Sequence, residues 1–193
     1  MRALAVYCGS ATPADPRFVE SARLVGRTLA ERGIAVVYGG GRLGLMGALA
    51  ESALAAGGTV HGVIPGALVE AELAHRGLSS LVTVRTMHER KAAFADMADG
   101  FLTLPGGVGT MDEHWEAMSW AQLGYHAKPV GLLNVAGYYD GLIAFAATMA
   151  ETGFVRPMHR DILIVDDDCG RLLDRMAAYR PHVPIAAMTA DEL

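Results

Sequence analysis

Lysine and cysteine are scarce in this 193-residue sequence. Only two lysines, Lys91 and Lys128, stand against fourteen arginines, which leaves few candidates for an enzyme that forms a Schiff base with its substrate or with pyridoxal phosphate. The two cysteines, Cys8 and Cys169, lie far apart and have no metal-binding spacing. We therefore expect free thiols, a reducing compartment and a cytoplasmic protein.

Long apolar runs and basic clusters are also missing. No stretch approaches the roughly 18 uninterrupted apolar residues of a membrane span, and the N-terminus has no signal-peptide layout. The formal net charge is −5, and the basic residues are scattered along the chain. These features argue against a membrane protein and against a nucleic acid partner. Apolar residues, by contrast, make up 52% of the chain, enough for a sizeable core and an interface with a second copy.

Short apolar runs alternate with helical patterns from one end of the chain to the other. Strands are predicted at residues 4–8, 35–38, 59–64, 81–84, 100–104, 130–134 and 162–165. Helices are predicted at residues 16–32, 43–56, 87–98, 110–123, 139–152 and 171–179, with a less clear short helix within 66–77. Because the strands lack polar alternation, we expect burial on both faces. The pattern predicts one α/β domain over residues 1–180, a doubly wound parallel sheet with helices on both faces, and a tail over 181–193.

Three glycine-bearing loops follow predicted strands. They contain Gly9-Ser10, Gly39-Gly40-Gly41 and the run PGGVGT at residues 105–110. Ligands of such sheets bind at the carboxyl ends of the strands, where glycines let backbone amides approach an anion and a helix N-terminus adds a favourable dipole. Any one loop could simply turn the chain. The convergence of all three favours a phosphate site that includes Ser10 and Gly41.

Two common phosphate-binding motifs do not fit these loops. Residues 39–44 match the spacing of the dinucleotide fingerprint, but residues 61–65, about twenty positions further on, contain no acidic residue to hold a ribose. The 105–110 loop lacks the Gly-Lys-Ser/Thr ending of an ATPase P-loop. The sequence therefore supports neither a nicotinamide dehydrogenase nor an ATPase.

Two charged clusters lie next to these loops. Arg90 and Lys91 belong to a helix start at residues 87–91, where cations oppose the helix dipole and indicate either a nearby anion or a solvated face. Asp112 and Glu113 are predicted in the first turn of the helix after the 105–110 loop, where carboxylates are ordinarily caps and dipole partners.

These residues resemble the two signatures of the LONELY GUY family of cytokinin riboside 5′-monophosphate phosphoribohydrolases. Residues 105–113 match its PGGxGTxxE signature, and residues 87–91 match the signature that ends in Arg-Lys. Similarity continues through 7–10, 38–47, 120–124 and 128–134, so that it covers roughly residues 1–180. Members have often been labelled lysine decarboxylases, but the two lysines here form no recognisable pyridoxal-phosphate motif.

The resemblance implies a Rossmann-like homodimer with a nucleotide site near the subunit interface. It implies hydrolysis of N6-prenylated adenosine monophosphates, and often of AMP, to the free base and ribose 5-phosphate. A small-molecule nucleotide is then the partner, and we expect no cofactor and no metal. Arg90 and Glu113 correspond to the catalytic pair. Substrate contacts are implied at Glu72, Arg90, Lys91, Gly107, Val108, Gly109, Thr110, Met111, Asp112, Glu113 and Ser119.

The chemistry suits these side chains. Cleavage of an N-glycosidic bond builds positive charge at the ribose C1′. Glu113 can either stabilise that charge or activate the water that attacks C1′. Arg90 stays protonated, so it orients groups and stabilises negative charge. Glycine amides and Thr110 would hold the 5′-phosphate.

Other polar residues are expected to be structural. His61 is predicted to be a satisfied core histidine. His88 and His114 adjoin the two signatures but can face solvent on their helices, and neither is expected to act at the site. Residues 166–168, three consecutive aspartates, are expected to cap a helix that includes Arg171. Two alternatives for the function stay open: a carrier of a phosphorylated ligand, of the molybdenum-cofactor type, and a hydrolase of another nucleotide.

Overall fold

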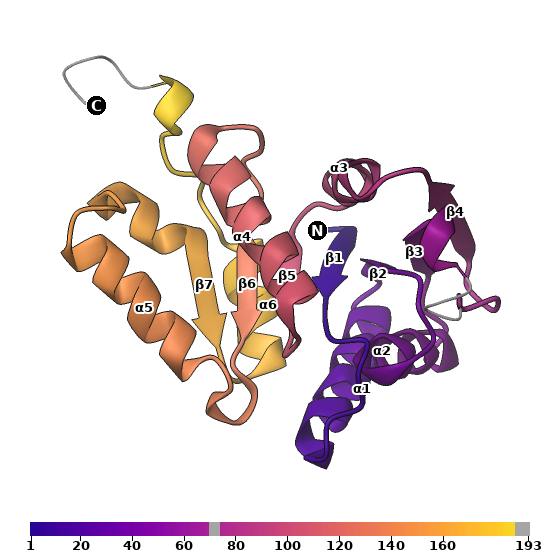
Figure 1. Cartoon of the computed structure of the whole chain (residues 1–193). Coiled ribbons are helices and arrows are strands. Elements are labelled where there is room, and N and C mark those ends of the chain that lie inside the picture. The colour runs from indigo at the N-terminus through magenta and orange to yellow at the C-terminus, as the bar shows by residue number, and fades with distance from the viewer. Residues whose placement is uncertain (70–73, 188–193) are drawn as a thin grey trace.

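A parallel sheet of seven strands runs through the computed structural model, which describes residues 1–69 and 74–187 (Figure 1). The order across the sheet is β4-β3-β2-β1-β5-β6-β7. The chain therefore starts in the middle of the sheet, extends it toward β4, and then returns to add β5, β6 and β7 on the other side of β1. The strands are β1 (Ala3–Tyr7), β2 (Ala35–Tyr38), β3 (Val60–Pro65), β4 (Ser80–Val84), β5 (Phe101–Thr103), β6 (Val130–Leu133) and β7 (Leu163–Asp166).

Helices cover both faces of the sheet. One face packs against α1, α2 and α6, and the other against α3 and α4, while α5 lies beside α4 over β7 (Figure 1). The predicted doubly wound α/β domain is confirmed. The helices are α1 (Pro16–Glu31), α2 (Gly44–Ala55), α3 (Met87–Met97), α4 (Val108–Leu123), α5 (Asp140–Glu151) and α6 (Cys169–Ala177), with 3₁₀ turns η1 (Gly66–Leu68), η2 (Val135–Gly137), η3 (Pro157–Ile162) and η4 (Ile185–Ala187).

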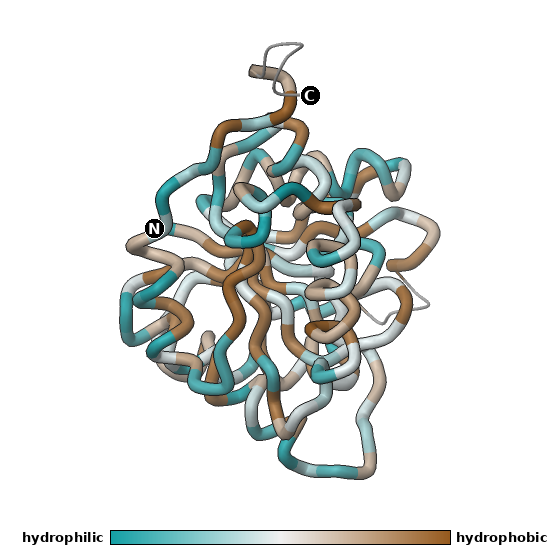
Figure 2. Tube along the Cα trace, turned by 90° about the vertical axis from the view of Figure 1, so that its left-hand side faces the viewer, coloured by the Kyte–Doolittle hydropathy of each residue, from teal (hydrophilic) through white to brown (hydrophobic). Residues whose placement is uncertain are grey.

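The central strands are buried on both faces, as their composition predicts. Leu4 and Val6 of β1 point into the core beneath α1 and α2, whereas Ala5 and Tyr7 point into the core beneath α3 and α4. Apolar residues gather along these strands in the middle of the molecule (Figure 2). The edge strand β4 differs, because most of its side chains are exposed, and the predicted burial on both faces is wrong for it. An edge strand has one neighbour and α3 covers it only in part.

Two boundaries differ from the prediction where the site is concerned. Helix α4 begins at Val108, two residues earlier than expected, so its first turn contains no acidic residue. Asp112 and Glu113 therefore lie in the second turn and do not cap the helix, which corrects that expectation. Within 66–77 the described structure has the 3₁₀ turn η1, and Ala74 forms an isolated bridge with Gly41.

The segment after residue 180 contacts the end of α4. His182 lies with Nε2 3.0 Å from the carbonyl oxygen of Ala121, and Pro184 lies against Gly124. In the part of the chain that the structure describes, none of the helices combines the length and apolarity needed to cross a bilayer. Both cysteines are free thiols, as predicted, and both are buried.

Candidate active site

The loops after β1 and β5 meet at the carboxyl edge of the sheet. The Gly9 amide donates to the Pro105 carbonyl at 3.1 Å, and the Gly9 carbonyl accepts from the Leu45 amide, in the first turn of α2, at 3.1 Å. A cavity of 320 Å³ opens beside this junction. It is lined by Cys8, Gly9, Ser10, Met46, Leu68, Met87, Arg90, Gly107, Val108, Gly109, Thr110 and Glu113.

One wall of the cavity is the N-terminus of α4. Its N-cap residue is Gly107, so no side chain caps the helix. Gly107, Val108 and Gly109 are exposed, whereas Thr110 is buried. A Cβ on Gly106 would lie 2.1 Å from the Thr110 hydroxyl oxygen, so the glycine permits this close approach. Amides at an uncapped helix N-terminus favour an anion, and the arrangement suits a phosphate.

Arg90 and Glu113 face each other across the cavity from α3 and α4. The Arg90 Nη2 atom lies 3.9 Å from Glu113 Oε1, and their side chains are only 7% and 11% exposed. The Arg90 guanidinium packs over the Phe94 ring, 5.5 Å from its centroid. Among the described residues the buried Nε of Arg90 has no hydrogen-bond partner. A buried guanidinium with unused donors is well placed for an acceptor on a ligand.

The glycine loop after β2 has a different place from the one expected. A Cβ on Gly39 would lie 2.1 Å from Arg90 Nη2 and 3.0 Å from Met46 Sδ. Gly40 has a φ of +77°, and Gly41 is buried, with its carbonyl accepting from the Tyr38 hydroxyl at 3.0 Å. Gly39 therefore makes room for the Arg90 guanidinium, and Gly41 is not part of the cavity lining.

Two groups near Glu113, the Tyr7 hydroxyl and the Cys8 thiol, are hard to ionise. Burial, and then the charges of Glu113 and Glu116, raise the pKa of Tyr7 well above its usual value. Burial and the Glu113 charge likewise raise the pKa of Cys8. The Cys8 thiol at the cavity wall is therefore neutral, and it is not an activated nucleophile.

Lys91 lies beside Arg90 but points to other partners. Its ammonium is 2.8 Å from Asp112 Oδ2 and 3.2 Å from Glu116 Oε1. Burial would lower the pKa of Lys91, but the hydrogen bonds to these two carboxylates outweigh it and raise the pKa above its usual value. Lys91 is therefore a stable cation between α3 and α4.

His114, adjacent to Glu113, is buried, and the expectation that it can face solvent is wrong. It belongs to the inward face of α4 with Thr110, Ala117 and Ala121, a spacing of three to four residues. Its Nδ1 lies 2.9 Å from the Thr103 hydroxyl, and burial lowers its pKa to about 4. The residue is neutral near pH 7.

His88 is exposed at the start of α3, as expected. The expectation for His61 is met in part. Its Nδ1 lies 2.7 Å from the Ser80 hydroxyl, which is a satisfied structural arrangement, but the residue is only partly buried and not in the core.

Most of the predicted substrate contacts gather around one cavity, and some lie away from it. Ser10, Arg90, the 107–110 loop and Glu113 line the cavity. The others do not line it: Gly41, Lys91, Met111, Asp112 and Ser119. Of these, Ser119 is exposed two turns further along α4. Glu72 lies outside the described residues.

Sequence reasoning missed the apolar part of the lining. Met46, Leu68 and Met87 come from α2, η1 and α3, respectively, and line the cavity. Methionine and leucine are common core residues, so nothing in the sequence distinguishes these three. Cys8 and Gly9 could have been included, because they directly follow β1 beside Ser10.

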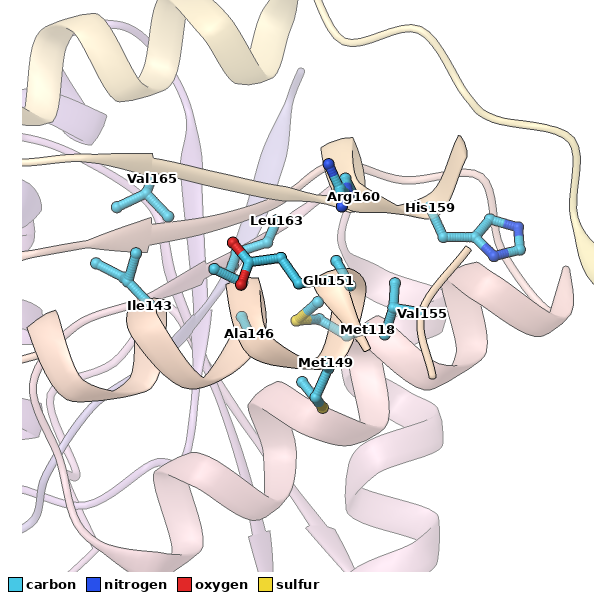
Figure 3. Close-up of a pocket in the computed structure, with 12 residues that line it drawn as sticks. Met118, Ile143, Ala146, Met149, Glu151, Val155, His159, Arg160, Leu163 and Val165 are labelled. Atoms are coloured by element: carbon cyan, nitrogen blue, oxygen red, sulfur yellow. The ribbon is translucent and has the colours of Figure 1, made fainter. Parts of the chain in front are cut away.

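A second cavity lies elsewhere and has a different character. It has a volume of 280 Å³ and is formed mainly by apolar side chains between α4, α5 and β7, including Met118, Ile143, Met149 and Leu163 (Figure 3). It contains none of the residues of the two charged clusters. We therefore assign the candidate active site to the cavity at α4.

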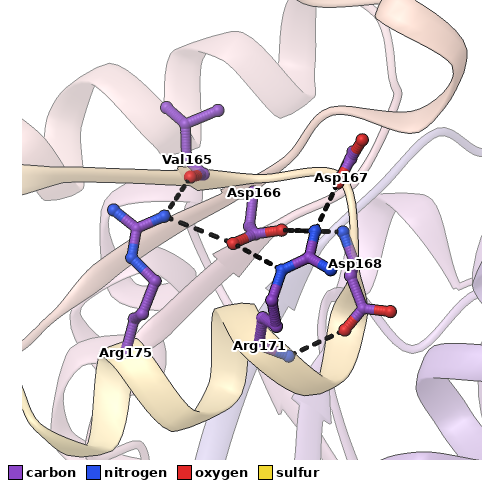
Figure 4. Close-up of polar contacts among 6 residues, drawn as sticks. All are labelled: Val165, Asp166, Asp167, Asp168, Arg171 and Arg175. Atoms are coloured by element: carbon purple, nitrogen blue, oxygen red, sulfur yellow. Dashed lines mark hydrogen bonds and ion pairs between the residues drawn. The ribbon is translucent and has the colours of Figure 1, made fainter.

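The aspartates at the end of β7 form an arginine-paired helix cap. The Asp168 side chain accepts from the Arg171 amide at 2.8 Å, which confirms the predicted capping. Asp166 pairs with Arg171 and Arg175 at 2.7 and 3.3 Å (Figure 4). The hydrogen bond from Arg171 is the main cause that lowers the pKa of Asp166 to about 2.

Comparison with known proteins assigns the chain to a family. Residues 46–176 match the family described as "possible lysine decarboxylase". A probable cytokinin riboside 5′-monophosphate phosphoribohydrolase of Oryza sativa subsp. japonica is 44% identical over 180 residues, which cover 93% of this chain and 79% of the relative. A cytokinin riboside 5′-monophosphate phosphoribohydrolase of Arabidopsis thaliana is 42% identical over 179 residues, with 93% and 82% covered.

Solved structures agree on the fold alone. The molybdenum cofactor carrier protein of Chlamydomonas reinhardtii superposes with a TM-score of 0.69 at 21% identity, over 91% of this chain and 97% of that one. The superposition supports a shared Rossmann-like architecture, whereas an identity this low says nothing about a shared ligand. Sequence identity above 40% over nearly the whole chain carries the assignment: the protein belongs to the LONELY GUY family of phosphoribohydrolases, which are N-glycosyl hydrolases.

Proposed function

We propose that this enzyme hydrolyses the N-glycosidic bond of cytokinin riboside 5′-monophosphates, and also that of AMP. The observation that carries the proposal is the pair Arg90 and Glu113, which face each other at 3.9 Å in a cavity that begins at the uncapped N-terminus of α4. The names of the relatives support the same reaction class.

The 5′-phosphate is proposed to bind at the start of α4. The amides of the 107–110 loop and the Thr110 hydroxyl would donate to its oxygens. Binding energy from this remote group would align the ribose without taking part in the bond cleavage. Ser10 lines the same cavity and is a further proposed contact.

Glu113 is proposed to act at the ribose C1′. The bond between C1′ and the purine nitrogen breaks, its electron pair leaves with the base, and water supplies the oxygen that forms the new bond to C1′. The Glu113 carboxylate would take a proton from that water or stabilise the positive charge at C1′. The products are the free base and ribose 5-phosphate.

Arg90 is proposed to orient Glu113 and to stabilise negative charge on the substrate. A guanidinium cannot act as a base because it keeps its proton. Its guanidinium packs over the Phe94 ring and occupies the space that the missing side chain of Gly39 leaves. An ammonium would not reproduce the planar fork of donors, so Arg90→Lys is expected to be poorly active.

The test is release of free base from isopentenyladenosine monophosphate and from AMP, measured side by side. Glu113→Ala is expected to lose turnover by about 10²–10⁴-fold while its thermal unfolding stays close to that of the wild type. Glu20→Ala is the matched control, because Glu20 is exposed on α1. Activity of Glu113→Ala equal to wild type would remove the catalytic role. Binding of both nucleotides without cleavage would favour a carrier.

We also infer a homodimer. Helix α5 is rich in apolar residues, yet none of its residues is buried within this chain, and Phe145 and Phe154 are 58% and 85% exposed. A large exposed apolar surface favours a protein interface. Light scattering after size exclusion tests this, and a mass near 20.4 kDa would contradict it.

A further inference from the structure

We propose that Lys91 is a positioning residue: its bridge to Asp112 and Glu116 holds α4 against α3 so that Arg90 and Glu113 face each other. This inference rests on the proposed function, and it gives Lys91 and Asp112 a role other than substrate contact. It starts from the ion pairs of the Lys91 ammonium, 2.8 Å from Asp112 and 3.2 Å from Glu116.

The bridge lies one residue away from the catalytic pair on both helices. Lys91 directly follows Arg90 on α3, and Asp112 directly precedes Glu113 on α4. Glu116 lies one helical turn beyond Asp112, so the two carboxylates are neighbours on the α4 surface at a spacing of four residues. Any sliding or rotation of α3 against α4 would therefore change the bridge and the Arg90–Glu113 distance together.

Helix α3 depends on such contacts because it buries little. Its fully buried residues are Arg90 and Phe94. Ala93, Ala95 and Met97 are only partly buried against the core, so Phe94 is the one large side chain that fixes the helix on the sheet.

The Lys91 side chain is only 11% exposed, and Glu116 is 25% exposed, whereas Asp112 is 56% exposed. The pair with Glu116 is therefore the shielded one. Ion pairs that are partly shielded from water are screened less by salt than exposed pairs.

The geometry leaves Lys91 little capacity for a nucleotide. Two of the three donors of the ammonium point to carboxylates, and Lys91 does not line the cavity that contains Arg90 and Glu113. Reaching a phosphate at α4 would require the ammonium to leave both partners. A substrate contact at Lys91 would also predict an effect on binding, whereas a positioning role predicts an effect on turnover.

The chain offers a matched control in its only other lysine. The Lys128 ammonium donates to the carbonyl of Ala95, near the opposite end of α3. Lys128→Met therefore removes a lysine anchor of the same helix away from the active site. It controls for general loosening of α3.

The experiment compares kcat and KM for isopentenyladenosine monophosphate in wild type, Lys91→Met, Lys91→Arg and Lys128→Met. Misplacement of a catalytic group by about 1 Å can cost on the order of 100-fold. We expect Lys91→Met to lower kcat by roughly 10- to 100-fold with KM changed by less than about 3-fold. Lys91→Arg, which keeps the charge, is expected to recover most of kcat, and Lys128→Met to keep it.

Removal of the two acceptors provides the second readout. The double variant Asp112→Asn/Glu116→Gln should lower kcat as Lys91→Met does, and combining all three changes should lower it no further, because the residues act as a unit. A raised KM with unchanged kcat in Lys91→Met would overturn the proposal and restore substrate contact. An equal loss of kcat in Lys128→Met would also overturn it, because general loosening of α3 would then explain the effect.

Failure of the proposed function gives a different result. In that case the wild type itself releases no base. The bridge is then judged by thermal unfolding, through the midpoints of Lys91→Met, Glu116→Gln and their combination. If the changes in unfolding midpoint of the single variants are not additive in the combination, the bridge fixes α4 on α3. Additive changes overturn the proposal.

Discussion

Gly39→Ala is expected to reduce activity, because the added methyl group displaces the Arg90 guanidinium. Gly39 follows β2 and lies beneath the Arg90 guanidinium, where a Cβ would be 2.1 Å from Nη2 and 3.4 Å from Cζ. Because non-bonded heavy atoms rest at roughly 3.5 Å, the guanidinium must move by more than about 1 Å to accommodate alanine. The backbone itself accepts the change, since the φ of Gly39 is not in the left-handed region.

The expected loss follows from the displacement. Arg90 Nη2 lies 3.9 Å from Glu113, and a shift of about 1 Å in a catalytic group can cost on the order of 100-fold in rate. A 100-fold loss in kcat/KM corresponds to about 2.7 kcal/mol of transition-state stabilisation. The clash is with the far end of a flexible side chain, so we expect the unfolding free energy to change by no more than about 1 kcal/mol.

The assay is base release from isopentenyladenosine monophosphate, together with thermal unfolding. Gly141→Ala is the matched control, because a Cβ there meets no atom within 4 Å and the residue lies in α5, away from the active site. In an Arg90→Ala background, Gly39→Ala should cause no further loss, since the side chain it displaces is gone. Full activity of a folded Gly39→Ala enzyme would refute the reasoning.

Two further predictions concern α4. Gly106→Ala would place a Cβ 2.1 Å from the Thr110 hydroxyl oxygen and displace a donor to the phosphate. We therefore expect binding of ribose 5-phosphate, measured by calorimetry, to weaken by roughly 10-fold or more. An unchanged Kd would contradict this. For His114, burial lowers the folded-state pKa to about 4, so below about pH 6.5 the unfolded chain binds a proton that the folded chain does not, and stability falls as pH falls. The free energy of unfolding, measured in urea, should fall between pH 7 and pH 5 by about 2 kcal/mol less in His114→Gln than in wild type. An identical fall in both would show that His114 does not carry this pH dependence.

The sequence alone determined the features that depend on neighbouring residues. Alternation of apolar runs and helical patterns is a local signal, and it predicts the parallel sheet and its helices. The PGGVGT run likewise predicts a helix start that can bind an anion, because the effects of glycine and of the helix dipole extend over only a few residues. Arg90 and Glu113 were identified through motifs of the same local kind, and the fold brings them to 3.9 Å.

The tertiary structure decided what depends on distant partners. Gly39 is separated from Arg90 by fifty-one positions, and only packing reveals that one makes room for the other. The partners of Lys91 are similarly remote in the chain. The burial of His114 follows from the direction that α4 takes over the sheet. Met46 and Leu68 line the cavity because the start of α2 and the end of η1 lie beside it. Side-chain packing is a property of elements already assembled, so no local pattern contains it.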